Sequence, residues 1–159
     1  GPDGSVTAGN ASGLADGAAL VVVMNEAALN ECGAAPLARI AGVARVGVDP
    51  RRMGLGPVPA VRQLLDKNGL SPSHIGYWEI NEAFAGQVLA VSDALEIPES
   101  QLNVDGGAIA VGHPLGASGA RILGRLSRTL TGRPGRDHGV AALCVGGGMG
   151  MAMLIESCQ

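Results

Sequence analysis

The chain has 159 residues, 47% of them hydrophobic, and a formal net charge of −3, which suits one domain with a sizeable core. It contains one Trp, one Tyr and one Phe and no basic tract, so the positive face and stacking rings of a nucleic-acid-binding protein are missing. The longest apolar run, Ala18–Met24, is too short to cross a bilayer. We therefore expect no nucleic-acid partner and no membrane span.

The three cysteines, Cys32, Cys144 and Cys158, are widely spaced. This spacing speaks against a disulfide scaffold and a zinc site, and it favours a reducing compartment. No targeting pattern is visible at the N-terminus, so we expect a cytoplasmic protein without a bound metal. The 26 glycines are clustered, which indicates close backbone approaches.

Short apolar runs alternate along the chain with amphipathic stretches, a pattern typical of an α/β domain. In the first half we expect a strand at Ala18–Met24, a helix at Glu26–Cys32 stopped by Gly33, a strand at Leu37–Val46, a loop from Asp49 and a helix from Pro59 to Asn68. We then expect a strand at Ile75–Ile80, a helix after Asn81, a brief strand at Leu102–Val104, a helix at Ala117–Leu130 and strands at Val140–Val145 and Met149–Ile155. The predicted architecture is a mostly parallel mixed sheet with helices on both faces and a C-terminal antiparallel hairpin.

Three side chains stand where a predicted strand ends or a predicted helix begins, the edge at which open α/β sheets place their sites. His113 lies among glycines before a helix, whose N-terminus disfavours imidazolium; a loop histidine bonded to the backbone is the plain alternative. Cys144 precedes a triple-glycine turn, although a buried, inert cysteine is the commoner case. Asn81 is explained equally well as a cap of the helix that follows. Spacing alone therefore predicts only a weak cysteine–histidine site.

One further expectation concerns the helix at Ala117–Leu130. Its aliphatic stripe should be buried, and its arginines, Arg121, Arg125 and Arg128, should point to solvent.

Five blocks of sequence closely resemble the C-terminal part of the thiolases, the family of acetyl-CoA acetyltransferases and 3-ketoacyl-CoA thiolases. The blocks are GSVTAGNASGLADGAA at Gly4–Ala19, VGVDPRRMGLGPVPA at Val46–Ala60, EINEAFAGQVLA at Glu79–Ala90, NVDGGAIAVGHPLGASGARIL at Asn103–Leu123 and CVGGGMGMAMLIES at Cys144–Ser157. They occur in the family's order and span nearly the whole chain. The CVGGGMG ending is more similar to the biosynthetic, short-chain branch.

The resemblance implies a thiolase-like fold and a role for each candidate residue. Thiolases condense two acyl-CoA molecules in a Claisen reaction or cleave a 3-ketoacyl-CoA with CoA. His113 would activate the nucleophilic cysteine and polarise the thioester oxygen, and Cys144 would act as general acid and base. Asn81 would hold a water that completes one oxyanion hole with His113, and the Gly146 N–H would contribute to the other. Cys144 needs a pKa below its ordinary value for this role, and the glycine turn is expected to lower it.

The resemblance also identifies two departures from the family. Asp105 stands where the family usually has asparagine, and its carboxylate would raise the pKa of His113 if the two come close. None of the cysteines matches the nucleophile, which thiolases carry in their N-terminal half. We therefore expect residues 1–33 to be the end of that half and residues 34–159 to be the C-terminal thiolase domain. Acyl transfer would need the N-terminal half as a separate chain or a missing segment.

CoA and acyl-CoA would be substrates, with no tightly bound cofactor, in a complete enzyme of fatty acid metabolism that forms homo-oligomers. Two alternatives stay open. One is a non-catalytic thiolase-fold assembly module. The other is a self-contained acyltransferase or hydrolase with Cys144 as nucleophile and His113 as base.

Overall fold

The computed structural model describes residues 3–133 and 135–158. Its centre is a four-stranded sheet in the order β1-β4-β3-β2. The strands are β1 (Ala38–Gly47), β2 (Tyr77–Ile80), β3 (His138–Val145) and β4 (Met149–Ser157). The α-helices are α1 (Glu26–Cys32), α2 (Pro57–Lys67), α3 (Ala85–Leu95), α4 (Ala108–Val111) and α5 (Ser118–Gly132), and the 3-10 helices are η1 (Pro50–Leu55), η2 (Pro72–His74) and η3 (Glu99–Gln101).

The sheet is mixed, which confirms the predicted α/β class. β2 and β3 run parallel, whereas β4 is antiparallel to both β1 and β3. The C-terminal hairpin is thus confirmed, and so is the mostly parallel mixed sheet, because β1, β2 and β3 run in one direction and only β4 runs the other way among the described strands. Connectivity accounts for this: helix α2 lies between β1 and β2 and helices α3 to α5 lie between β2 and β3, whereas β4 returns from β3 through a tight turn.

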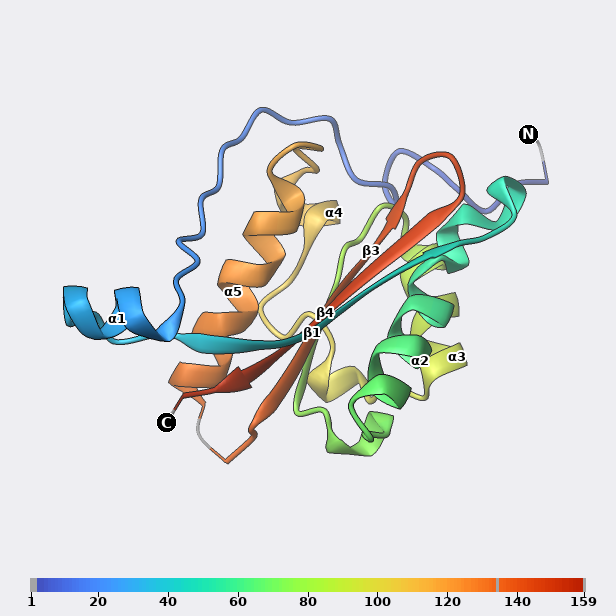
Figure 1. Ribbon diagram of the computed structural model, residues 1–159. Helices are drawn as coiled ribbons and strands as arrows, with labels where there is room; N and C mark the ends of the chain where they lie inside the picture. The colour runs from blue at the N-terminus through green and yellow to red at the C-terminus, as the bar shows by residue number, and fades with distance from the viewer. Residues whose placement is uncertain (1–2, 134, 159) are drawn as a thin grey trace.

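Helices cover both faces of this sheet (Figure 1). α2 and α3 lie on one side and bury the larger apolar cluster, in which Leu64, Trp78 and Val91 are at most 1% exposed. α5 lies on the other side, where its Ile122, Leu126 and Leu130 form a second cluster. These three residues recur every fourth position, so they form one stripe along the helix.

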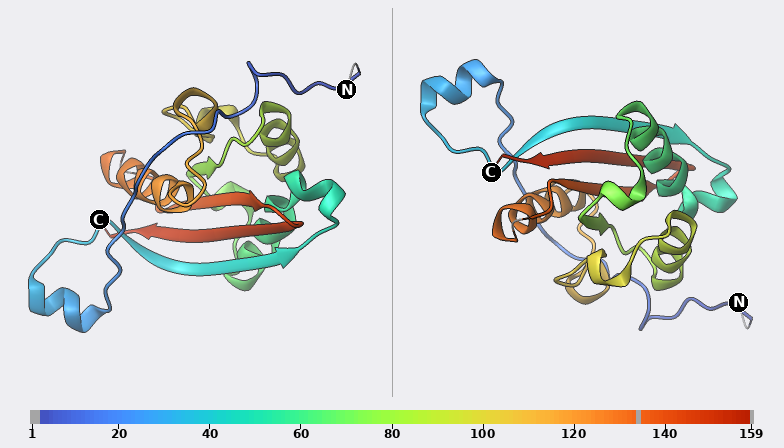
Figure 2. Two further views of the ribbon diagram at one scale, coloured as in Figure 1. Left: turned by 90° about the horizontal axis from the view of Figure 1, so that it is seen from above. Right: turned by 90° about the horizontal axis from the view of Figure 1, so that it is seen from below.

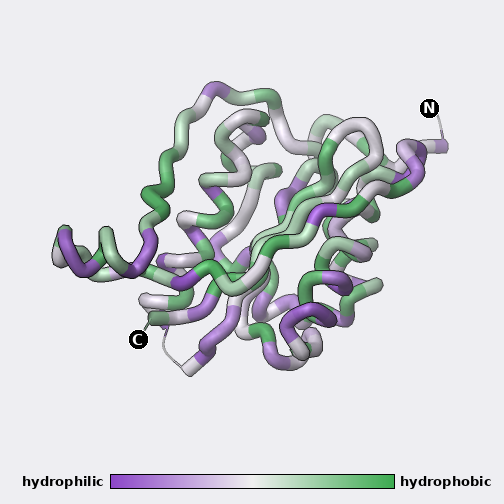
Figure 3. The backbone as a smooth tube through the Cα atoms, viewed as in Figure 1, coloured by the Kyte–Doolittle hydropathy of each residue, from purple (hydrophilic) through white to green (hydrophobic). Residues whose placement is uncertain are grey.

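The strand predicted at Ala18–Met24 is wrong. This segment is extended but pairs with no described strand, and Leu20 and Val22 are 83% and 70% exposed. It runs past α5 outside the sheet (Figures 2 and 3). Apolar composition suits a strand, but a strand forms only where a neighbour accepts its backbone hydrogen bonds. Helix α1, by contrast, follows as predicted and ends at Gly33 with a φ of 65°.

The strand predicted at Leu102–Val104 is reduced to a single bridge between Trp78 and Leu102. Asn103 has a φ of 43°, and its side-chain amide takes both backbone groups of Ile80, at 2.9 Å each. This side chain occupies the place of the next strand residue, so the ladder stops there. No helix of the described residues has the length and apolarity to cross a membrane.

Candidate active site

Asn81 and His113 meet at the end of β2. The Asn81 N–H continues the β2–β3 ladder by donating to Ala142 O at 2.9 Å. Its side-chain Nδ2 lies 3.3 Å from His113 Nε2. The expected helix cap is therefore wrong: α3 begins only at Ala85, with Phe84 at the cap position and no side-chain cap. Asn81 is 1% exposed, and its side-chain amide contacts His113 instead of capping α3.

His113 is placed by its backbone and by a serine one helical turn away. Its N–H donates to Gly13 O at 2.9 Å. Its Nδ1 lies 2.6 Å from Ser118 Oγ, and that hydroxyl donates to Pro114 O at 3.1 Å. A hydroxyl has one proton, so Ser118 accepts from Nδ1–H. His113 Nε2 is then left with a lone pair toward Asn81.

The surroundings of His113 favour the neutral imidazole. Burial lowers the pKa of His113, and the nearby Arg121 guanidinium lowers it further. In this tautomer the Nε2 lone pair accepts from the Asn81 amide at 3.3 Å, and a neutral imidazole can take up a proton at neutral pH. The geometry therefore gives His113 the properties of a general base.

Cys144 lies near the end of β3, beside the position where β2 ends. Because these two strands are parallel, with Ile80 opposite Ala142, Asn81 and Cys144 share one edge of the sheet. Cys144 is 8% exposed, and burial raises the pKa of its thiol. The expected lowering by the glycine turn is thus wrong, because loss of hydration disfavours the thiolate more than the backbone stabilises it. Cys144 keeps its proton at neutral pH.

Gly146 begins the turn between β3 and β4, and it is exposed. The turn needs glycine at its next two positions, where Gly147 and Gly148 have φ values of 86° and 88°. A Cβ at Gly148 would also overlap the backbone of Val48 and Pro50. At Gly146 a Cβ would meet nothing within 4 Å, so close packing does not require glycine at this position.

A cavity of about 330 Å³ lies against His113, lined also by Leu14, Ala15, Asp16 and Leu115. The backbone segment of residues 13–16 reaches His113 through a parallel bridge between Leu14 and His113. The spacing of the candidate residues does not indicate this segment, because it lies about 100 residues before His113 and contributes mainly backbone and apolar side chains. The block at Gly4–Ala19 was the one signal that pointed to it.

Asp105 does not engage His113. Its carboxylate lies 2.8 Å from Arg133 and 3.9 Å from Arg125, and the influences on the pKa of His113 are burial and Arg121. Arg125 also approaches Glu79 at 3.5 Å and is only 23% exposed, so the expectation that it points to solvent is wrong.

Within residues 3–133 and 135–158, no group of three His, Cys, Asp or Glu residues is arranged to hold a metal ion.

Comparisons with known proteins agree with this fold. A family model described as "Thiolase, C-terminal domain" matches residues 34–157. The acetyl-CoA acetyltransferase of Shinella zoogloeoides is 54% identical over 155 residues, which cover 98% of this chain and 39% of that protein. The crystal structure of the Bacillus anthracis acetyl-CoA acetyltransferase superimposes with a TM-score of 0.93 at 51% identity, over 98% of this chain and 39% of that one.

A third relative was solved with a ligand. The crystal structure of human mitochondrial 3-ketoacyl-CoA thiolase in complex with CoA has a TM-score of 0.89 at 45% identity, covering 99% of this chain and 40% of that one. The chain belongs to the thiolase family and corresponds to its C-terminal part. It spans about 39% of the length of these curated relatives.

Proposed function

We propose that this chain supplies the C-terminal part of a thiolase active site, which condenses acyl-CoA molecules or cleaves a 3-ketoacyl-CoA with CoA. The roles of His113, Cys144, Asn81 and Gly146 belong to this proposal. The observation that carries it is the contact of 3.3 Å between Asn81 Nδ2 and His113 Nε2. The names of the relatives, acetyl-CoA acetyltransferase and 3-ketoacyl-CoA thiolase, support the reaction class.

His113 serves the reaction in two steps. With Nδ1–H bound to Ser118, its Nε2 lone pair takes the proton of the nucleophilic cysteine, and the cysteine thiolate attacks the thioester carbon. The new Nε2–H then donates toward the thioester oxygen, where negative charge develops. Asn81, whose buried Oδ1 has no hydrogen-bond partner within the described residues, has a free acceptor for a water that completes this oxyanion site.

Cys144 moves the second proton. Burial raises the pKa of its thiol, so the role proposed here does not use the lowered pKa expected from the sequence: the protonated thiol donates its proton to the leaving CoA thiolate. The Cys144 thiolate formed in that step is correspondingly basic, and it then removes a proton from the carbon beside the thioester of the second acyl group. In this proposal the N–H of Gly146, an exposed residue, stabilises the resulting enolate oxygen.

CoA and acyl-CoA are the proposed substrates, without a tightly bound cofactor. The nucleophile and much of the CoA site would come from thiolase regions to which this chain does not correspond. The exposed Ala18–Met24 segment supports such a completion, since an extended apolar run of this kind is normally covered by protein. We place the complete enzyme in the cytoplasm, as a homo-oligomer of fatty acid metabolism, and we place the domain boundary between residues 33 and 34. The free state of Cys32, Cys144 and Cys158 is consistent with that compartment.

The test is thiolysis of acetoacetyl-CoA by the chain mixed with a thiolase N-terminal half that carries the nucleophile, with intact mass spectrometry of both components. We expect CoA-dependent turnover that His113→Ala abolishes and Asn81→Ala reduces. His74→Ala is the matched control, because His74 is exposed and bonds only Ser71.

Two outcomes would contradict the proposal. Turnover by the 159-residue chain alone, abolished by Cys144→Ala, would indicate the self-contained enzyme. A stable complex of the two components without turnover, unchanged by His113→Ala, would indicate the assembly module.

A further inference from the structure

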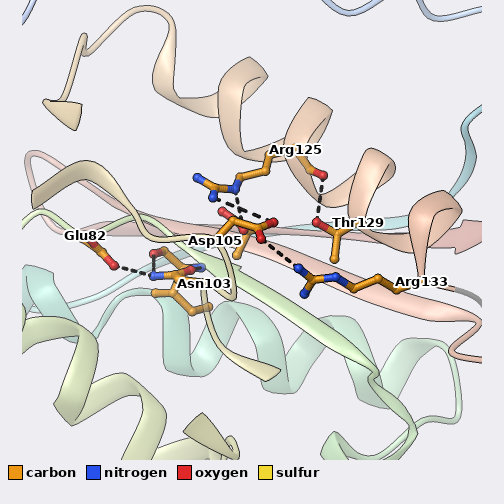
Figure 4. A network of polar contacts seen from close by, with 8 residues as sticks. Glu82, Asn103, Asp105, Arg125, Thr129 and Arg133 are labelled. Atoms are coloured by element: carbon orange, nitrogen blue, oxygen red, sulfur yellow. Dashed lines mark hydrogen bonds and ion pairs between the residues drawn. The ribbon is translucent and has the colours of Figure 1, made fainter. Parts of the chain in front are cut away.

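Glu82 joins the two segments that carry Asn81 and His113. It follows Asn81 directly, and its carboxylate faces the loop that leads from Asn103 to α4 (Figure 4). One oxygen, Oε1, accepts from Asn103 Nδ2 at 3.0 Å. The other, Oε2, accepts from the Ile109 N–H at 3.1 Å. The carboxylate therefore uses both oxygens on two groups that lie six residues apart, one at the start of this loop and one in the first turn of α4.

Asn103 extends this link back to β2. Its amide holds Ile80 N–H and Ile80 O at 2.9 Å each while its Nδ2 also bonds Glu82. Ile80 and Glu82 flank Asn81, so both neighbours of Asn81 are tied to the loop. From Ile109 the chain continues through the rest of α4 and Gly112 to His113.

The fit around Glu82 is close. A Cβ at Gly107 would overlap the Glu82 carboxylate, so the loop packs directly on it. On its outer side the same loop is held by Asp105, whose partners Arg125 and Arg133 lie on or next to α5 (Figure 4). Asp105 is 47% exposed, so these outer ion pairs are weak by comparison. The inner contact through Glu82 is the one that restrains the loop relative to Asn81.

We infer that Glu82 is a positioning residue that fixes His113 relative to Asn81. The inference rests on the proposed function for its effect on turnover, but not for its effect on the imidazole. Both carboxylate oxygens accept from N–H donors, so Gln is not an adequate substitute: its amide presents only one acceptor, and its NH2 faces a second N–H. Glu82→Gln thus severs one of the two contacts without changing the size of the side chain.

The first experiment is nuclear magnetic resonance of the 159-residue chain with labelled imidazole. In Glu82→Gln we expect the hydrogen of the Ile109 amide to exchange with solvent about tenfold faster or more. We also expect the Nε2 and Nδ1 chemical shifts of His113 to move toward those of a mobile imidazole that interconverts between its two tautomers. Glu99→Gln, on the exposed helix η3, is the size-matched control. Asp105→Asn releases the outer side of the same loop and should leave the His113 signals in place.

The second experiment is turnover with the N-terminal half. We expect Glu82→Gln to lower kcat by about tenfold or more, since small displacements of a reacting group are costly. The KM for acetoacetyl-CoA should stay within about twofold, as for a group that acts on the chemical step alone. Asn103→Gly, which keeps the positive φ accessible, should give the same effect, and the double variant should be no worse than either single variant.

Glu82 would be shown to support only the fold if Ile109 exchange rises while the His113 signals and kcat stay unchanged. If Glu82→Gln does not fold, Asn103→Gly decides the question through the His113 signals and kcat, because it removes the other contact of the Glu82 carboxylate. An inactive wild-type mixture would overturn the proposed function, whereas the imidazole signals would still test the positioning role.

Discussion

Ser118 Oγ lies between His113 Nδ1, at 2.6 Å, and Pro114 O, at 3.1 Å. Because the hydroxyl proton goes to the carbonyl, the serine is an acceptor for the imidazole and selects its Nδ1–H tautomer. Ser118 is fully buried, so water does not compete for this contact. A serine in the first turn of α5 thereby determines which nitrogen of His113 is a base.

Ser118→Ala should lower kcat by about tenfold, the value of one ordinary hydrogen bond. The acceptor for Nδ1–H is lost, so the imidazole populates the other tautomer and rotates more freely. Nitrogen chemical shifts of His113 measure the tautomer, and the thiolysis assay measures kcat. Ser127→Ala is the control, because Ser127 makes the same kind of bond within α5, to Leu123 O at 2.9 Å. Equal rates for the two variants would remove Ser118 from the mechanism.

Arg121→Gln should raise the pKa of His113 toward its ordinary value of 6.5, because the Arg121 charge is one of the two causes that lower it. A base works only when deprotonated, so the acid limb of the rate profile should move to higher pH. The pH dependence of thiolysis measures this limb. Arg128→Gln, an exposed arginine on the same helix, should leave the limb unmoved. An unshifted limb in Arg121→Gln would mean that burial alone sets the pKa.

The elements that the sequence predicted well are those whose signals are local. The stripe of Ile122, Leu126 and Leu130 predicted α5, and the apolar runs on either side of the glycine turn predicted the β3–β4 hairpin. The strand predicted at Ala18–Met24 does not form among the described residues. An apolar pattern does not indicate whether a neighbouring strand is present to pair with it. Strand pairing is a long-range property that the apolar pattern of one segment does not encode.

The sequence indicated candidate residues for a site but not the contacts between them. His113, Cys144 and Asn81 stood at the ends of predicted elements, and the thiolase blocks gave them roles. In the sequence Ser118 is equally well explained as the start of a helix, and Glu82 as a surface carboxylate. Only the contacts of Ser118 with His113 and of Glu82 with Ile109 single these two residues out. The cap role of Asn81 and the low pKa of Cys144 failed because each depends on packing: Asn81 turns toward His113, and Cys144 is buried.

Cys144 should react with iodoacetamide at neutral pH far more slowly than Cys32 or Cys158. Both of the latter are exposed, whereas Cys144 is 8% exposed and burial raises the pKa of its thiol. The thiolate is the reactive form. The raised pKa and the burial of Cys144 should together make its alkylation at least about tenfold slower than that of Cys32 or Cys158. Peptide mass spectrometry over time measures the three rates. Rapid labelling of Cys144 would instead favour the reading in which it is the nucleophile.

Glu79 is the most strongly perturbed acid among the described residues. It is 3% exposed on β2, and burial raises its pKa from 4.5 to about 7, although Arg125 and Arg121 oppose that shift. Asp105 and Glu82 add smaller contributions in the same direction as burial. At 3.5 Å, the Arg125 contact does not compensate for the lost hydration of the carboxylate.

The consequence is a stability that declines as the pH rises. The folded chain holds the Glu79 proton more tightly than the unfolded chain, so this contribution is complete below pH 4.5 and is lost through about pH 7. Glu79→Gln does not titrate, and its free energy of unfolding should lack this decline, which amounts to roughly 3 kcal/mol for a shift of this size. Urea unfolding at several pH values measures both proteins.

The control for this prediction is Glu31→Gln, on the exposed helix α1, which should follow the wild type at every pH. Arg125 keeps Asp105 as a partner in Glu79→Gln, so its side chain is not left uncompensated. The variant should therefore be more stable than the wild type above pH 7 and similar to it near pH 4.5. A constant difference across this range would mean that Glu79 keeps an ordinary pKa and that Arg125 fully offsets its burial.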